Sequence, residues 1–286
     1  MADNAVLKPA DGLERKKKKS RILYILLGVC IVAVIISAAG LGYEVYLNSE
    51  SQQYYSSLAA DIPARQRYVA KINAQLQPLA TTLEATQPVD GVAYTQEQWM
   101  PYVNFDALRE SLSGISAWIK LDNTKLNYPL MQGADNYFYL SHLPDGTKHR
   151  SGSIFIDYRN NADFSDKSTL VYGHASKTGD MFGILKNYRK QSFYEENPVI
   201  YIYTPDRDYA LVLVAGYLID SGKETPPQEF KDDAGFQAHI SSIKQRSLFV
   251  SDVDVSIDDR IVSLCTCAYD YPNARLVIVG KLVELQ

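Results

Sequence analysis

Cysteine is scarce in this sequence, with three residues among 286, and Cys30 lies within a long apolar run. The other two, Cys265 and Cys267, stand one residue apart. In a strand both side chains would point to one face, and a disulfide between them would be strained. A small extracellular domain stapled by disulfides is therefore excluded. The hydrophobic core must hold the fold, which leaves a thiol free for chemistry.

Basic residues are also scarce beyond the first 21 positions. After Arg21 the chain holds 22 Lys and Arg against 30 Asp and Glu, a net charge of −8. Nucleic-acid binding requires a basic stripe, so this class of function is excluded. Residues 1–21 differ, with seven basic and three acidic side chains and a net charge of +4. We expect this segment to be a disordered cytoplasmic tail.

Ligand patterns for metal ions are missing as well. None of the four histidines has a second His or Cys at a ligand spacing, and Cys265 and Cys267 are too close together to serve as such a pair. The acidic residues show no calcium-loop spacing. The sequence therefore predicts no metal and no cofactor.

Charge is absent from the 22 positions 22–43. A helix of this length rises by about 1.5 Å per residue and spans the roughly 30 Å core of a bilayer. The basic cluster at 15–21 predicts a cytoplasmic N-terminus, with the chain from Glu44 outside the cell membrane. A cleaved signal peptide is the alternative, since Ser37-Ala38-Ala39 offers a cleavage site. The long basic region and the apolar residues up to Leu47 favour a retained single-pass anchor.

Glycine is absent from residues 48–86, where apolar residues recur at near-helical spacing. This pattern predicts one or two helices within a segment at 44–104, forming a stalk or packing on the main domain, and an exposed spacer is the alternative. A further helix is predicted over 105–116, at the start of a domain covering 105–286.

Strand signals dominate the rest of the chain, where Val, Ile, Tyr and Thr are separated by turn residues. Eight strands are predicted, at 117–121, 126–130, 152–157, 168–172, 199–204, 209–220, 260–266 and 276–285. Helical insertions are expected at 181–190 and 232–246. Eight strands with few long helices predict a mainly β fold, a closed or nearly closed barrel, rather than alternating βαβ units.

Two strand ends carry the candidate chemistry. Cys267 ends the apolar strand at 260–266, and Arg275 opens the next strand after a turn. A cation there would favour the thiolate and donate hydrogen bonds to an oxyanion. His174 follows the strand at 168–172 through Gly173. On these residues alone, two core cysteines, a surface arginine and a structural histidine remain the alternative.

Several segments together resemble the sortases. In that family a Tyr-Gly-His segment, a Thr-Leu-any-Thr-Cys segment and a following Arg occur in this order. The matching segments are Tyr172-Gly173-His174, Asp180-Met181-Phe182-Gly183, Ser263-Leu264-Cys265-Thr266-Cys267 and Asn273-Ala274-Arg275. Residues 152–160 and 191–194, with the helical insertion before the Cys strand, resemble class B. The resemblance runs from about 117 to 285. It implies a closed eight-stranded sortase barrel with N-terminal helices.

The resemblance also implies the site residues. The family's catalytic histidine, cysteine and arginine match His174, Cys267 and Arg275, and substrate-binding positions match Asn136, Leu140, Cys265 and Thr266. Ser263 replaces the usual first Thr of the motif, and Cys265 occupies its variable position. Residues 225–227 match no substrate-contacting residues of the family, so the sorting signal is not predicted.

The implied function is that of a cysteine transpeptidase on a Gram-positive surface. It would cleave a sorting signal of secreted proteins after Thr, through a thioacyl intermediate on Cys267. It would then transfer the product to an amine of the cell wall or of a pilin. Two alternatives remain open. One is a thiol hydrolase acting on wall peptides, and the other is an anchored, non-catalytic binding domain whose 21 tyrosines supply contact surface.

Overall fold

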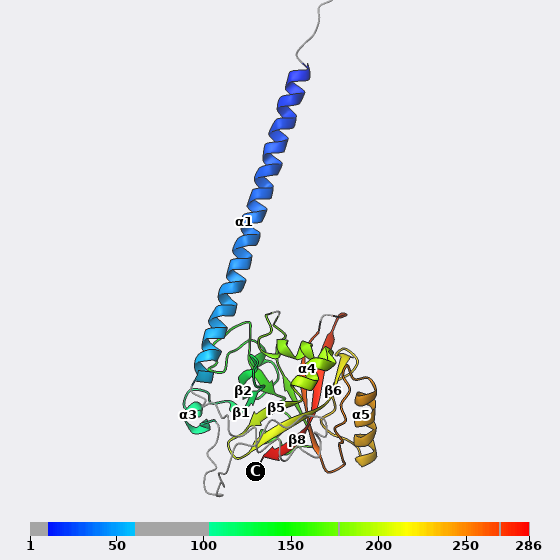
Figure 1. The fold of residues 1–286 in the computed structure, drawn as a ribbon. Coiled ribbons are helices and arrows are strands. Elements are labelled where there is room, and N and C mark those ends of the chain that lie inside the picture. Colours follow the sequence, from blue (N-terminus) through cyan, green and yellow to red (C-terminus); the bar gives the residue numbers. More distant parts are fainter. Residues whose placement is uncertain (1–10, 61–102, 177, 269, 286) are drawn as a thin grey trace, which may run out of the picture. The chain divides into compact units, whose positions relative to one another are not determined.

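The computed structural model describes residues 11–60, 103–176, 178–268 and 270–285 (Figure 1). The chain forms two compact units, Met1–Gln53 and Tyr54–Gln286. Much of the segment predicted to form a helical stalk, from residue 61 onward, lies outside the described residues.

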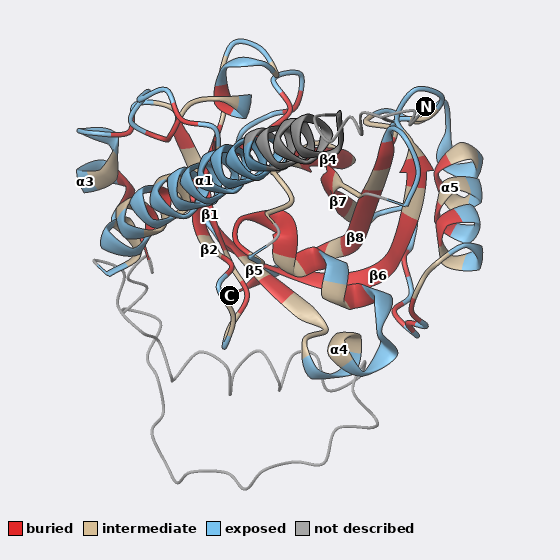
Figure 2. Ribbon diagram, turned by 90° about the horizontal axis from the view of Figure 1, so that it is seen from above, coloured by how far each residue is buried: buried red, intermediate tan, exposed pale blue. Residues whose placement is uncertain are grey.

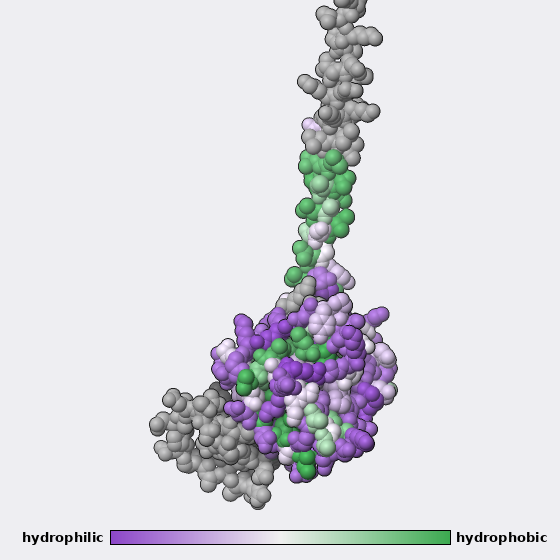
Figure 3. Space-filling view, turned by 90° about the vertical axis from the view of Figure 1, so that its right-hand side faces the viewer, coloured by the Kyte–Doolittle hydropathy of each residue, from purple (hydrophilic) through white to green (hydrophobic). Residues whose placement is uncertain are grey.

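The first unit consists of a single described element, the helix α1. This helix runs without a break over Asp11–Ala60, and its last turns belong to the second unit. Its apolar stretch is exposed and gives the green band of Figure 3. By length and composition α1 is able to cross a membrane, which is consistent with the predicted anchor at 22–43 or with a signal sequence.

Eight strands of the second unit close into a barrel, as predicted. Their order is β1-β2-β3-β4-β7-β8-β6-β5. The β2–β3 and β4–β7 pairs are parallel and the other neighbours are antiparallel. The strands are β1 (Ile115–Lys120), β2 (Asn127–Met131), β3 (Ile154–Ile156), β4 (Ser168–Tyr172), β5 (Val199–Tyr203), β6 (Asp208–Asp220), β7 (Arg260–Cys267) and β8 (Ala274–Leu285).

The helix predicted over 105–116 is wrong beyond Arg109. Helix α3 spans Phe105–Arg109, and its start is capped by Asn104, whose Oδ1 accepts a hydrogen bond from the Ala107 amide. Ser111, Ser113 and Gly114, which come shortly after it, have lower helix propensity. Ile115 then pairs with Met131 in the β1–β2 ladder, so barrel pairing overrides the local pattern.

Both predicted insertions are helical. The first is the 3-10 helix η2 (Phe182–Arg189), and the α-helix α4 (Gln191–Glu196) follows it directly. The second insertion is the α-helix α5 (Asp233–Gln245), as predicted. It begins where the Asp232 carboxylate accepts a hydrogen bond from the Gly235 amide at 2.8 Å. A short 3-10 helix, η1 (Phe138–Leu140), lies between β2 and β3.

Strand β7 is buried on both faces. Val262 and Leu264 point into the barrel, whereas Ile261 and Cys265 belong to an outer cluster that includes Phe236 of α5. Figure 2 shows α5 against the outside of β6 and β8, with its far side exposed. The alternation along β7 therefore places Cys265 and Cys267 on the outer face of the barrel.

Candidate active site

Cys267 and Arg275 face each other across two strands. They are direct partners in the antiparallel β7–β8 ladder, and Arg275 pairs on its other side with Ile219 of β6. Side chains of directly opposed residues share a face, with Cβ atoms about 4.5–5.5 Å apart. Ile219, Arg275 and Cys267 therefore form one row across three strands.

His174 lines the same pocket as this row of residues. In the parallel β4–β7 ladder Tyr172 pairs with Cys265, and the Gly173 amide donates to the Cys265 carbonyl at 3.2 Å. The ladder ends there, and His174, two residues beyond Tyr172, lines the same pocket as Cys267. The structure thus brings together the three residues that the resemblance identified as catalytic.

A backbone carbonyl fixes the imidazole of His174. Its Nε2 atom lies 2.7 Å from the carbonyl oxygen of Leu140. A carbonyl only accepts hydrogen bonds, so Nε2 carries a proton. Proton exchange with a substrate is thereby left to Nδ1.

The backbone that carries this carbonyl depends on Gly152. Gly152 has φ of +54°, and a Cβ there would meet the carbonyl oxygens of Tyr139 at 2.6 Å and Leu140 at 2.7 Å. We expect Gly152→Ala to destabilise the fold by more than the roughly 1–2 kcal/mol of left-handed backbone strain. It should also slow turnover, because Leu140 must shift under His174. Urea unfolding and the rate of peptide transfer measure the two effects.

Gly146→Ala is the matched control. Its φ is +85°, but a Cβ there meets nothing within 4 Å. It should carry the backbone strain alone and leave turnover unchanged. Equal effects of the two substitutions on stability and turnover would show that the contact with Leu140 has no role.

All seven predicted site residues line one pocket. The pocket has a volume of about 280 Å³. The seven are Asn136, Leu140, His174, Cys265, Thr266, Cys267 and Arg275. Further lining residues, to which the sequence assigned no role in the site, include Phe155, Ile219, Glu224, Thr225 and Pro226. Residues 225–227 carried no family match, and their spacing gave no sign that they reach this pocket.

The loop between β6 and β7 is held beside the pocket by an ion pair. Both guanidinium amino groups of Arg246, which follows α5, donate to the Glu224 carboxylate, one of them at 3.0 Å. These hydrogen bonds hold the pKa of Glu224 below its usual range. The loop after Cys267 is tied similarly, since Arg189 donates to Asp270 at 2.9 and 2.6 Å. Both loops bordering the site are therefore anchored by bidentate pairs.

The two thiols of the site differ in accessibility. Cys265 is 5% exposed, whereas Cys267 is partly exposed. Burial raises the pKa of Cys265 to about 12, although the charge of Arg275 opposes this shift. The thiolate is the nucleophilic form, so Cys265 stays a protonated, inert thiol at neutral pH. Cys267 is the thiol that a substrate is able to reach.

Cys265→Ser should therefore leave peptide transfer within about threefold of the unchanged chain, because the reactive thiol is kept. Cys267→Ser is the paired variant and should be inactive. The rate of product formation on a peptide substrate separates them. Activity lost with Cys265→Ser and kept with Cys267→Ser would mean that the nucleophile is the other thiol.

The guanidinium of Arg275 keeps most of its donors available. Within the described part of the chain its side chain makes one hydrogen bond, from Nη1 to the Ala274 carbonyl at 3.0 Å. Four of its five N–H groups remain for a ligand.

As for metal ions, no group of three or more His, Cys, Asp or Glu among the described residues is placed to hold one.

Comparison with known proteins agrees with the motif resemblance. No model of a protein family matches the chain. Sortase B of Staphylococcus aureus is 35% identical over 183 residues, covering 63% of this chain and 75% of that protein. Sortase B of Listeria monocytogenes is 38% identical over 168 residues, covering 58% and 68%. A solved Staphylococcus aureus sortase B–substrate complex is 29% identical with a TM-score of 0.65, covering 84% of this chain and 99% of that one.

Proposed function

Since the chain belongs to the sortase B family of cysteine transpeptidases, we propose that it cleaves a sorting signal after Thr and joins the product to an amine of the cell wall or of a pilin. The observation that supports this best is the pairing of Cys267 with Arg275 across β7 and β8, at a pocket that His174 also lines.

The proposed reaction proceeds in two halves. The Cys267 thiolate attacks the Thr carbonyl carbon, and the Arg275 guanidinium donates hydrogen bonds to the oxyanion. The carbon–nitrogen bond breaks as His174 gives a proton to the leaving amine, which leaves a thioester on Cys267. An incoming amine then attacks the thioester, loses its proton to His174 and releases the thiolate.

The N-terminal part of the chain would hold this domain at a membrane. We propose a cytoplasmic tail at 1–21, an anchor at 22–43, a connecting segment at 44–104 and a catalytic domain at 105–286 outside the cell membrane. The basic cluster before α1's apolar stretch supports this orientation. Tethering would confine the enzyme to the face where exported substrates arrive, which raises their local concentration.

The test uses the full chain in detergent and a library of peptides that each contain one Thr. Intact-mass measurement should find a thioacyl adduct on Cys267 and cleavage after Thr. Adding triglycine, which a sortase B crystal structure contains, should yield the ligated peptide. Cleavage with water as the sole acceptor would favour the hydrolase alternative. A chain that forms no adduct with any peptide would contradict the proposal.

A further inference from the structure

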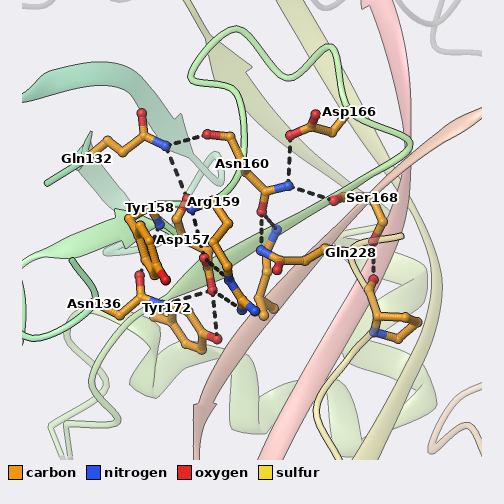
Figure 4. A network of polar contacts seen from close by, with 12 residues as sticks. Gln132, Asn136, Asp157, Tyr158, Arg159, Asn160, Asp166, Ser168, Tyr172 and Gln228 are labelled. Carbon is orange, nitrogen blue, oxygen red and sulfur yellow. Dashed lines mark hydrogen bonds and ion pairs between the residues drawn. The ribbon is translucent and has the colours of Figure 1, made fainter. Parts of the chain in front are cut away.

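Asp157 is a buried carboxylate that none of the assigned catalytic steps uses. It follows β3, and its side chain has no exposed surface. Arg159 donates to it three times, from its amide at 3.0 Å, from Nε at 2.9 Å and from Nη2 at 2.8 Å. Figure 4 shows Asp157 at the centre of a network of polar side chains from several segments of the chain.

Two of its other partners line the pocket. Oδ2 of Asp157 accepts from Asn136 Nδ2 at 2.9 Å and from the Tyr172 hydroxyl at 3.3 Å. Oδ1 of Asn136 in turn accepts from the Tyr158 amide at 3.0 Å. Both ends of the Asn136 amide are therefore tied to the framework. Among the residues that the structure describes, Nδ2 makes this one hydrogen bond, so its second hydrogen is available to a substrate.

The same network reaches the loop between β6 and β7. Gln228 donates to Asn160 Oδ1 at 2.7 Å, and the Ser168 hydroxyl donates to the Pro227 carbonyl at 2.7 Å. Asn160 lies three residues after Asp157, and Thr225 and Pro226 of the pocket lie just before these bonds. The network thus connects two separate parts of the pocket lining.

The carboxyl group of Asp157 stays ionised at neutral pH. Burial opposes its ionisation, but the hydrogen bonds from Arg159, Gln228 and Asn136 outweigh burial and hold the pKa of Asp157 at about 2. The carboxylate therefore accepts from all its donors over the whole pH range in which the chain would be assayed.

We propose that Asp157 is a positioning residue for the sorting peptide: its carboxylate fixes Asn136 and Tyr172 in the geometry that binds the peptide. This inference rests on the proposed function. Asp157 has no exposed side-chain surface and is not among the residues that line the pocket, so its effect should fall on substrate binding rather than on the chemistry at Cys267.

Asp157→Asn tests the proposal with the full chain, triglycine and the best peptide of the Thr library. The amide replaces an acceptor by a donor facing Asn136 and Arg159. KM for the peptide should rise about tenfold while kcat stays within about threefold, the pattern of lost ground-state binding. Alkylation of Cys267 by iodoacetamide, which needs no peptide pocket, should be unchanged.

Asp163→Asn is the matched control. Asp163 lies in the same loop, is exposed, and accepts from the Ser165 amide at 3.0 Å. It should leave KM unchanged. An Asp157→Asn chain with unchanged KM, or with a loss confined to kcat, would overturn the proposal. Absence of transfer by the unsubstituted chain would instead refute the proposed function, and this inference with it.

Tyr172→Phe keeps the test valid if circular dichroism shows that Asp157→Asn fails to fold. The substitution removes the hydroxyl that binds Asp157 and retains the ring. KM should rise about threefold, because one of the two positioned side chains is released. Where Asp157→Asn folds, adding Tyr172→Phe to it should have no further effect. An unchanged KM for Tyr172→Phe, or additive effects in the double variant, would overturn the proposal.

Discussion

Cys267→Ala is expected to abolish thioacyl formation and transfer while leaving a folded chain. The residue ends β7 and is partly exposed, so losing one sulfur should change the free energy of unfolding by about 1 kcal/mol or less. The reaction loses its nucleophile, and the rate should fall roughly 10⁴-fold or more. The measurements are intact mass after incubation with peptide, the rate of ligation to triglycine, and thermal unfolding.

Cys265→Ala is the control for this experiment. It removes the same atom from the same face of the same strand, two residues away, and should retain the adduct and the transfer. Persistent transfer by Cys267→Ala would refute the assignment of the nucleophile, provided that both variants unfold at temperatures close to that of the unsubstituted chain.

The position of the proposed catalytic residues could be predicted because each stands at the end of a strong strand pattern. The apolar run before Cys267 and the turn before Arg275 specify a hairpin, and a hairpin places the two residues opposite each other. His174 required the parallel β4–β7 pairing as well. Local patterns do not show which strands pair when they lie about 90 residues apart in the chain. The placement of His174 beside the other two residues was therefore predicted from the family motifs.

The parts that could not be predicted depend on long-range contacts. The helix expected up to residue 116 ends earlier because Ile115 pairs with Met131 and begins β1 of the barrel. Thr225 and Pro226 line the pocket because hydrogen bonds of the next two residues hold their loop in place. The Pro227 carbonyl accepts from Ser168, and Gln228 donates to Asn160. His239 lies on α5 and is half-buried, and this burial lowers its pKa.

The network around Asp157 shows the same limit. The segment containing Asp157, Arg159 and Asn160 was recognisable as a class B pattern, but its partners Asn136, Tyr172 and Gln228 come from three other segments. A sequence pattern identifies these polar residues without showing which of them share one buried carboxylate.

Arg275→Ala is expected to lower kcat by about 10²–10³-fold, the usual cost of losing one oxyanion donor. Four N–H groups of Arg275 are unused within the described residues, and its strand position fixes it opposite Cys267. KM should change less, because the oxyanion forms after binding. Arg275→Lys should recover a minor part of the rate, since an ammonium keeps the charge but lacks the planar fork of donors.

Arg207→Ala is the matched control for that loss. Arg207 precedes β6 at the end opposite Ile219, and it pairs with Glu284 on the surface. Its removal should leave kcat within about twofold, since exposed pairs contribute little. Stopped-flow measurement of thioacyl formation isolates the first chemical step, where the Arg275 effect should appear in full. If Arg275→Ala forms the thioester at an unchanged rate, the oxyanion must be stabilised by other donors, such as backbone N–H groups near Cys267.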